Sequence, residues 1–420
     1  MLDLHRKVAI LSLYLIFFVD LLALVVFIVV LGPMMLENGS SLALSKFSNH
    51  ERYFLMGLLL AAYPAIQLLS NPILGAFSDW WGARKILLYS TLGSAIASAL
   101  SAVAIAMGSY LLLLFSRLFA GLVSGTMTVS QSGVSSLTVW KTKGRHMSTF
   151  ATLRGLGWVV GPLLAGLLSN NKLSPIFNYS TPFWMIALLF AIAYILVLFS
   201  VRTPSQSEER LRHTHFLKAF LALTAVFKMP KMTLPFLMGS LNRAGWSFFI
   251  LFSSTYMVEK FHLHRGQISE FFTYSAAWYL ASGIFCQLLL YKIAHTNLLL
   301  VIFLFLQAAA VAAILPFLSA EILWWVLPVT SLAGTVVMTG FYLLYSGLAG
   351  GQNQGKIFGS WNASLALSSA SIPLLNGWLA GYWLEFPFFL SAAILFVTAL
   401  YFLVWYLRHQ SHFVEESLHD

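Results

Sequence analysis

The 420-residue chain is poor in charge. Asp, Glu, Lys and Arg together make up 9% of it, whereas a soluble domain carries about 25%. Hydrophobic residues make up 59%, and a soluble fold of this length could not hide them, because its surface must be covered with polar groups. The scarcity of charge therefore excludes a soluble protein and predicts a chain with many membrane-spanning segments.

Cysteine and reactive clusters are scarce as well. The single cysteine, Cys286, lies in an apolar run, so no disulfide framework can form. Two His-x-His pairs lack further metal ligands nearby. The segment Gly350–Lys356 has phosphate-loop spacing, but it follows an apolar run, and Ile357 stands where a hydroxyl would bind magnesium. With no catalytic triad either, we expect no enzyme activity, no metal and no cofactor.

Long apolar runs are what the chain does contain. Backbone groups in lipid must be satisfied internally, and runs of about 20 residues without alternation favour helices over barrel strands. We count twelve such runs: residues 8–36, 52–77, 86–107, 110–138, 147–169, 181–201, 233–258, 267–289, 294–316, 322–346, 357–380 and 382–407. The predicted fold class is an all-α membrane protein with twelve transmembrane helices.

The basic residues predict the orientation of these helices. With the N-terminus inside, 16 of the 24 Lys and Arg residues lie in cytoplasmic segments, five lie outside and three lie within runs. Cytoplasmic loops carry such an excess, so both termini are predicted to be cytoplasmic. The net charge of +10 is then a topology signal and not a sign of nucleic-acid binding. The first run passes Pro33 without a small-residue cleavage site, which indicates a retained span.

A polar segment divides the chain into two parts. Six runs precede residues 202–232 and six follow them. The predicted units are an N-terminal six-helix bundle (1–201), a cytoplasmic linker with an amphipathic helix on the membrane surface (202–232) and a C-terminal six-helix bundle (233–420).

The two parts also align with each other. An offset of 222 residues sets Asp20 on Asn242 and Glu37 on Glu259, which indicates an internal repeat. Two related bundles are expected to face each other across a central cavity lined by the first helix of each.

Four charged residues lie deep in the runs, namely Asp20, Arg117, Arg154 and Arg243. Each costs about 2.5–3.5 kcal/mol on insertion scales, so such residues usually have a function. A cavity that alternately wets and dries would make Asp20 take up and release a proton; a structural ion pair is the alternative. If Arg154 and Arg243 face the cavity, an anionic or zwitterionic substrate is favoured; snorkelling or pairing with carbonyls is the alternative.

Polar and aromatic side chains near these charges complete a predicted substrate site. The candidates are Arg154, Arg243, Asn242, Gln131 and Trp246. Other aromatic residues, such as Trp158, could stack on a ligand, although most aromatics in such a chain pack or anchor the interface.

Three motifs follow one another in the first half of the chain. They are G-A-F-S-D-W-W-G-A-R-K at Gly75–Lys85, S-R-L-F-A-G at Ser116–Gly121, and G-L-G-W-V-V-G-P-L-L-A-G at Gly155–Gly166. They resemble the polar loop after the second helix, the fourth-helix R-x-x-x-G pattern and the fifth-helix signature of major facilitator superfamily transporters. Trp80 and Ala83 depart from the loop pattern. The stretch from the second motif to the third looks like that of tetracycline exporters, which are drug:proton antiporters.

This resemblance implies roles for individual residues. Arg117 would lie near Asp20 and tune its proton affinity. The gating set would consist of Gly75, Asp79, Gly82, Arg84 and Lys85 in a polar cytoplasmic latch, and of Gly157, Gly161, Pro162 and Gly166 on a bent helix with a bare surface.

The sequence thus predicts a proton-coupled secondary transporter that works by alternating access. The first hypothesis is export of a small drug-like or metabolite molecule, such as a carboxylate siderophore, by proton antiport. The alternatives are proton-coupled import of an organic anion or amino acid, and a transporter-like receptor or scaffold. The expected partners are a small-molecule substrate, protons and membrane lipid, without nucleic acid. The chain is expected to be monomeric, in a bacterial inner (cytoplasmic) membrane.

Overall fold

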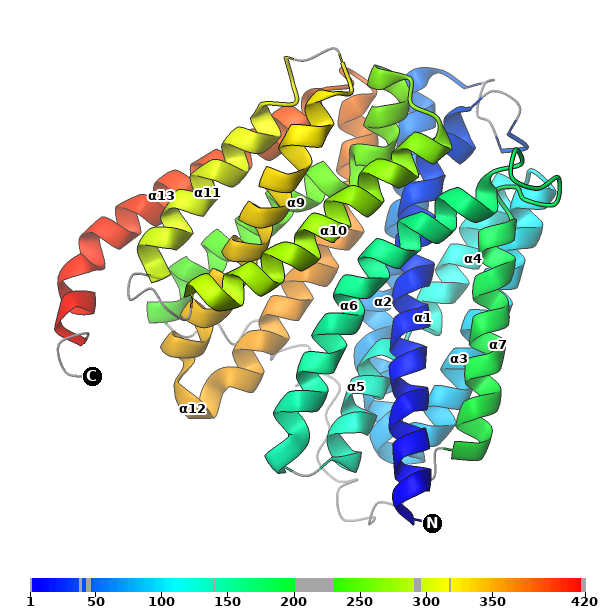
Figure 1. Ribbon diagram of the computed structural model, residues 1–420, viewed down its shortest axis with the longest axis horizontal. Helices are drawn as coiled ribbons and strands as arrows, with labels where there is room; N and C mark the ends of the chain where they lie inside the picture. Colours follow the sequence, from blue (N-terminus) through cyan, green and yellow to red (C-terminus); the bar gives the residue numbers. More distant parts are fainter. Residues whose placement is uncertain are drawn as a thin grey trace.

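The computed structural model describes residues 2–37, 40–42, 47–138, 140–200, 230–290, 296–316 and 319–416, and every regular element within them is a helix. The N-terminal half comprises α1 (Leu2–Leu36), α2 (Asn49–Trp81), α3 (Ala83–Ala106), α4 (Tyr110–Leu122), α5 (Thr126–Leu137), α6 (Trp140–Ser169) and α7 (Thr181–Ser200). The C-terminal half comprises α9 (Pro230–Phe261), α10 (Arg265–Leu290), α11 (Thr296–Ala312), α12 (Ile322–Ala380) and α13 (Phe386–Glu416) (Figure 1).

Eight helices in the described part of the chain are long and apolar enough to cross a membrane, and Asn297–Ala312 is a shorter apolar helix. The predicted all-helical membrane fold is thereby confirmed. Two helices outside this group, α9 and α10, contribute polar side chains such as Arg243 and Tyr279 to cavities, which makes them less apolar. The predicted linker at 202–232 lies outside the described residues except for 230–232, which begin α9.

Three local features differ from the predicted spans. The polar stretch Gly75–Lys85 is not an extended loop, because α2 and α3 continue up to a single residue, Gly82. The predicted fourth span is interrupted at 123–125, between α4 and α5. The predicted tenth and eleventh spans form one continuous helix, α12, which doubles back at the lower end of Figure 1. Hydropathy locates apolar stretches, but it does not report where backbone hydrogen bonds continue or stop.

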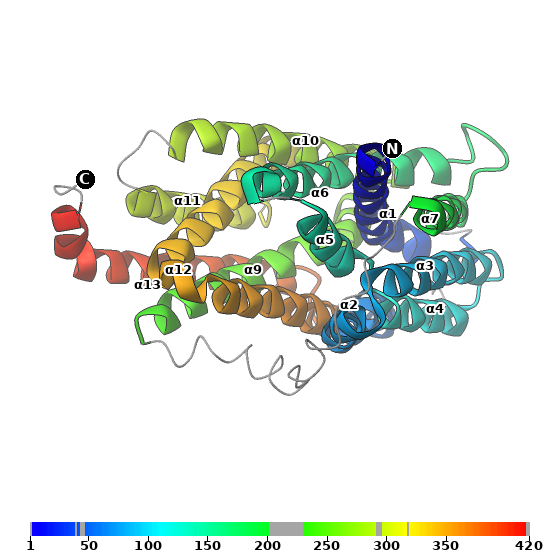
Figure 2. The ribbon, with the colours of Figure 1, turned by 90° about the horizontal axis from the view of Figure 1, so that it is seen from below.

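The two halves lie side by side, with α2 against α12 and α6 against α10 (Figure 2). Between these pairs, α1 contacts α9. The backbone N–H of Gly32 donates a hydrogen bond to Oγ of Ser254 at 3.1 Å, and these residues are 222 positions apart. This is the offset at which the two halves align in sequence. Equivalent residues of two related units can touch only near the axis that relates them, so the contact supports the internal repeat.

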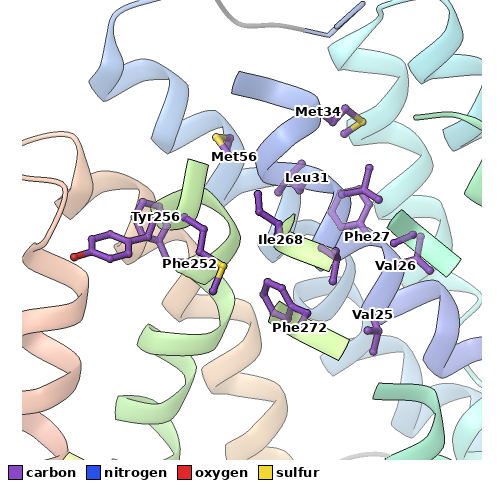
Figure 3. Packing of buried hydrophobic residues seen from close by; sticks show 14 of the residues in the cluster. Val25, Val26, Phe27, Leu31, Met34, Met56, Phe252, Tyr256, Ile268 and Phe272 are labelled. Atoms are coloured by element: carbon purple, nitrogen blue, oxygen red, sulfur yellow. The ribbon is translucent and has the colours of Figure 1, made fainter. Parts of the chain in front are cut away.

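A buried apolar cluster joins the halves at the end opposite to the start of α1, called here the outer end. Leu31 from α1 and Met56 from α2 pack there with Phe252 from α9 and Ile268 from α10 (Figure 3). In lipid, close packing stabilises contacts between helices, because the lipid tails are as apolar as the side chains.

Close contacts between helices seal the same outer end. A methyl group built on Gly377 of α12 would clash with the carbonyl oxygen of Tyr53 in α2, and one built on Gly166 of α6 would clash with Ser269 of α10. At the other end, a methyl group on Gly75 would meet no atom within 4 Å. The halves therefore pack tightly at the outer end and diverge towards the inner end, as their ribbons do in Figure 1.

Candidate functional site

A small buried cavity inside the N-terminal half contains Asp20 and Arg117, which are 5% and 6% exposed. This Asp20 cavity has a water-accessible volume of about 20 Å³, which is enough for one ordered water molecule. Its wall is formed by α1, α2, α3, α4 and α7. The two charged residues predicted to act together thus share one cavity, but that cavity is not the central one in which Asp20 was expected.

The two charges meet without fully satisfying each other. They interact electrostatically, yet Oδ2 of Asp20 and Nε of Arg117 are both buried without a hydrogen-bond partner. The guanidinium carbon of Arg117 lies 3.9 Å from the ring centroid of Phe27 and 5.1 Å from that of Tyr63. Cation–π contacts therefore hold Arg117 in place and leave the carboxylate short of one partner.

A second small cavity occupies the C-terminal half, at the position that the repeat relates to the first. Here Asn242 stands where the N-terminal half has Asp20, and its amide donates to Gln307 Oε1 at 3.0 Å. Arg243 and Trp246 also line this cavity, whose water-accessible volume is about 40 Å³. The side-chain amides of Asn242 and Gln307 thus bond each other, whereas Asp20 keeps one oxygen without a hydrogen-bond partner. The two halves therefore differ in the chemistry of their small cavities.

A third cavity, the central cavity, lies between the halves. Arg154 and Trp158 of α6 face Arg243 and Trp246 of α9 across it, and its water-accessible volume is about 120 Å³. Three of the five predicted substrate residues therefore share the central cavity. Asn242 lines the second cavity instead, and Gln131 in α5 lies outside the lining of all three.

The predicted cytoplasmic latch is only partly visible. Gly82 has a φ of 84° and forms the sharp junction of α2 and α3, a conformation that favours glycine. Arg84 donates to the carbonyl oxygen of Leu198 at 2.7 Å, so in this state it binds the end of α7 in its own half. Lys85 is exposed, and the side chain of Asp79 lies outside what the structure describes.

The glycines of α6 serve two different neighbours. Gly157 and Gly161 lie against Leu21 and Val25 of α1, within the N-terminal half. Further along, the hydroxyl of Ser269 in α10 donates to the carbonyl oxygen of Pro162, across the boundary between the halves. A side chain at Gly157 or Gly161 would push α6 away from α1, so the bare surface brings these helices into close contact.

A polar network closes the outer end. Glu37, after α1, accepts from the backbone N–H of Arg265 at 3.1 Å and from the hydroxyl of Tyr179. The Arg265 side chain donates to Asn171 Oδ1 at 2.6 Å. Burial, followed by the hydrogen bond to Glu37, raises the pKa of Tyr179 well above its usual value, so its hydroxyl stays protonated and donates. Glu37 thus links the loop before α7 with the start of α10 in the other half.

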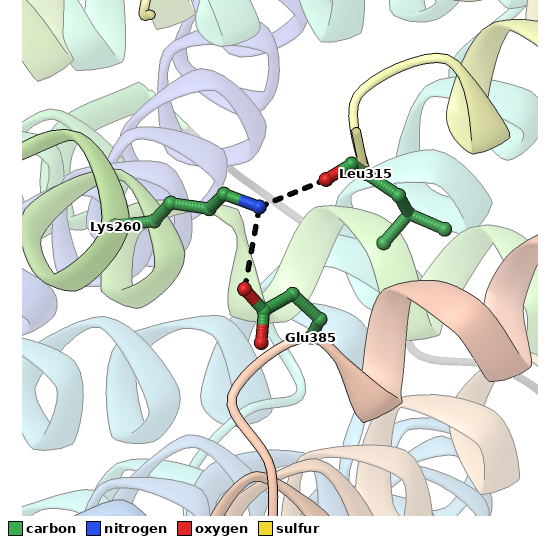
Figure 4. A network of polar contacts seen from close by, with 3 residues as sticks. All are labelled: Lys260, Leu315 and Glu385. Carbon is green, nitrogen blue, oxygen red and sulfur yellow. Dashed lines mark hydrogen bonds and ion pairs between the residues drawn. The ribbon is translucent and has the colours of Figure 1, made fainter. Parts of the chain in front are cut away.

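A second polar group holds the outer end of the C-terminal half together. Lys260 at the end of α9 donates to the carbonyl oxygen of Leu315 at 2.9 Å and pairs with Glu385 at 3.2 Å (Figure 4). All three residues belong to the same half, so this group stiffens one half and does not link it to the other.

We expect Glu37→Gln to loosen the outer closure, because an uncharged amide accepts these hydrogen bonds less strongly than a carboxylate. The free energy that stabilises the closed outer end should fall by about 1–3 kcal/mol. The test is labelling of Ser269→Cys by a membrane-impermeant maleimide, in a background with Cys286→Ser. Faster labelling is expected with Glu37→Gln. The control is Glu51→Gln, since in the described part of the chain the Glu51 carboxylate accepts hydrogen bonds from its neighbour Ser48. Equal rates for the two variants would contradict a role of Glu37 in closure.

Sequence reasoning missed several of these residues. Tyr63 and Tyr279 had no distinguishing pattern, because aromatics are common throughout the chain. Gln307 could have been noticed as a polar residue in an otherwise apolar run. Glu37 was aligned with Glu259, but its partners come from distant segments and left no sequence signal.

Comparison with known families identifies the chain. A family model of the Major Facilitator Superfamily matches residues 13–349, well over half of the 420 residues. The chain belongs to the Major Facilitator Superfamily. It is therefore a transporter-family protein with several membrane-spanning helices, and the family and fold are those of transporters rather than enzymes.

Individual relatives in this superfamily match the chain over part of its length. Tetracycline resistance protein, class H, of Pasteurella multocida is 33% identical over 152 residues, 36% of each protein. Major facilitator superfamily domain-containing protein 10 of Mus musculus is 29% identical over 154 residues, 37% of this chain and 31% of the relative. The chain thus matches about a third of the length of these curated relatives.

Solved transporter structures match the fold over nearly the whole chain. The human organic anion transporter MFSD10 (TETRAN) has a TM-score of 0.66 at 18% identity and covers 94% of this chain and 99% of its own. A bacterial homolog of the human lysosomal transporter Spinster, in an inward-facing and occupied conformation, has a TM-score of 0.71 at 12% identity and covers 95% of this chain and 96% of its own. At these identities the likeness shows the fold alone.

Among the described residues of this superfamily member, no group of three or more His, Cys, Asp or Glu side chains is arranged to hold a metal ion.

Proposed function

We propose that this protein is a proton-coupled secondary transporter that exports a small organic molecule from a bacterial cytoplasm in exchange for protons. Asp20 carries the coupled proton, and Arg117 tunes its release. The central cavity takes the substrate. The chain acts as a monomer in the inner membrane, surrounded by lipid.

One observation carries the proposal: Asp20 and Arg117 share a buried cavity in which the carboxylate keeps an unpaired oxygen. The free energy of a charged carboxylate depends strongly on whether water reaches it and on how close an arginine lies. A conformational change that wets the Asp20 cavity or moves α4 therefore changes proton binding. A permanent ion pair would respond far less.

The packing of the halves supports alternating access. Contacts that cross between the halves are concentrated at the outer end, where Gly166, Gly377 and Glu37 lie. Such contacts form in one state and break in the other, so they bias the equilibrium between two orientations of the halves. Gly82, Arg84 and the remaining latch residues play the corresponding part at the inner end in the opposite state.

The direction of transport rests on the relatives. Tetracycline resistance proteins match the chain at about 30% identity, and the motifs shared with that branch lie on α4–α6. Proton-coupled import of an organic anion or amino acid is the second candidate, favoured by the arginines of the central cavity, which attract an anion from either side.

The test is proton flux into liposomes that contain the purified protein and a pH-sensitive dye. Carboxylates, amino acids and drugs are added outside one at a time. A substrate that triggers proton movement in the opposite direction to its own establishes antiport, and movement in the same direction establishes symport. If no compound moves protons while binding is still observed, the protein acts as a receptor and the proposal is wrong.

A further inference from the structure

The central cavity is positively charged and is built from both halves. Arg154 comes from α6 in the N-terminal half and Arg243 from α9 in the C-terminal half. None of the described residues in its lining carries a carboxylate. Asp20 lies in its own cavity, so no described residue that lines the central cavity neutralises the two arginines.

The two guanidinium groups repel each other, because the charge of Arg154 acts on that of Arg243 as a like charge. The other side chains that interact electrostatically with Arg243 are the phenols of Tyr279 and Tyr342, not carboxylates. Nε of Arg243 is buried without a hydrogen-bond partner. The ring of Phe17, 5.9 Å from the guanidinium carbon of Arg154, offers a weak cation–π contact. Two such charges in a low-dielectric cavity leave a strong requirement for an anion.

Aromatic surfaces stand directly beside these charges. Trp158 lies one helical turn after Arg154 on α6, and Trp246 lies three residues after Arg243 on α9, so each pair shares a helix face. Trp246 packs against Phe249 with ring centroids 5.2 Å apart, which holds its indole in place. Each half therefore presents one arginine and one tryptophan to the same space.

We propose that the central cavity is an anion clamp for an aromatic carboxylate. Arg154 and Arg243 bind the carboxylate from opposite sides, and Trp158 and Trp246 stack on the ring. This proposal rests on the transport function proposed above and names the substrate class of its binding site. Arginine suits the task because its planar guanidinium can bind a carboxylate through two hydrogen bonds.

The clamp also has a consequence for transport. Without an anion, the repulsion between Arg154 and Arg243 keeps α6 and α9 apart where the halves diverge. A carboxylate between them turns this repulsion into attraction and draws the inner parts of the halves together. The charge of the substrate then favours closure of the inner end.

Equilibrium binding to the purified full-length protein in lipid nanodiscs tests the clamp without any proton gradient. The probes are naphthoate and naphthamide, which have the same ring and nearly the same shape but differ in charge. Naphthoate should bind at least about tenfold more tightly. Arg154→Gln and Arg243→Gln should each weaken naphthoate binding about tenfold or more and leave naphthamide binding nearly unchanged, while Arg→Lys at either position restores part of the loss.

The matched control is Arg408→Gln, which removes an exposed arginine in the C-terminal part of α13. It should leave naphthoate binding unchanged, and a single sharp peak in size-exclusion chromatography should verify that every variant is folded. Equal affinity for both probes, no naphthoate binding at millimolar concentration, or wild-type binding in both glutamine variants would overturn the clamp. Because binding is measured without a proton gradient, a failure of proton coupling remains distinguishable from a failure of the clamp.

Discussion

Asp20→Asn should reduce substrate-driven proton movement to the level of liposomes without protein. The amide has nearly the same shape as the carboxylate, but it cannot gain or lose a proton in the physiological range. Because Asp20 is 5% exposed and its Oδ2 has no hydrogen-bond partner, the substitution removes a charge without breaking a contact of that atom. Arg117 loses its counter-charge in this variant, so a single sharp peak in size-exclusion chromatography is needed to verify that it is folded.

The measurement is the dye-based proton flux together with exchange of labelled substrate at equal concentrations on both sides. The variant is expected to lose the first and keep the second, because exchange requires movement of the halves but no net proton transfer. Asp20→Glu is the matched control, since it retains an ionisable carboxyl group and should keep part of the flux. Wild-type proton flux in Asp20→Asn would remove Asp20 from the coupling mechanism.

Gly377→Val should disfavour closure of the outer end and slow transport. A side chain at this position meets the carbonyl oxygen of Tyr53 and the Cα atom of Phe54, both backbone atoms that cannot turn aside. Overpacking of this kind costs about 1–3 kcal/mol, which shifts a two-state equilibrium by about 5- to 150-fold. The cost falls only on the state in which α12 touches α2, so the outward-open state should be favoured.

Two readings test this prediction. Substrate exchange should fall at least about fivefold, and Ser269→Cys should become reactive to an impermeant maleimide from outside. The control is Gly283→Ala in α10, where an added methyl group meets no atom within 4 Å; it should exchange substrate normally. If Gly377→Val exchanged substrate at the wild-type rate, the tight contact between α2 and α12 would not be part of the transport cycle.

Part of the candidate site could be found from sequence because burial of charge in an apolar run is a local property. Asp20, Arg117, Arg154 and Arg243 stand out in any hydropathy profile, since each is costly in lipid. The offset of 222 residues was visible because it aligns polar residues of the two halves, Asp20 with Asn242 and Glu37 with Glu259. The hydrogen bond between Gly32 and Ser254 joins residues at this same offset.

The assignment of these charges to cavities could not be found in this way. Whether Asp20 faces the space between the halves or the interior of one half depends on the rotation of α1 about its own axis. A rotation of one residue turns a side chain by about 100°, and hydropathy in a fully apolar helix does not record it. The separation of the Asp20 cavity from the central cavity is consequently a tertiary result.

The sequence by itself determined that this chain spans a membrane with helices, and it predicted that basic residues mark one face and that two related halves flank a polar segment. These properties follow from composition, run length and charge placement, each of which acts locally along the chain. The tertiary structure alone decided that α4 and α5 are separate, that Arg84 binds the end of α7, and that Glu37 joins two halves of the molecule. The contacts of Arg84 and Glu37 join residues that are 114 and 228 positions apart. They form only once the helices have packed at a particular distance and rotation.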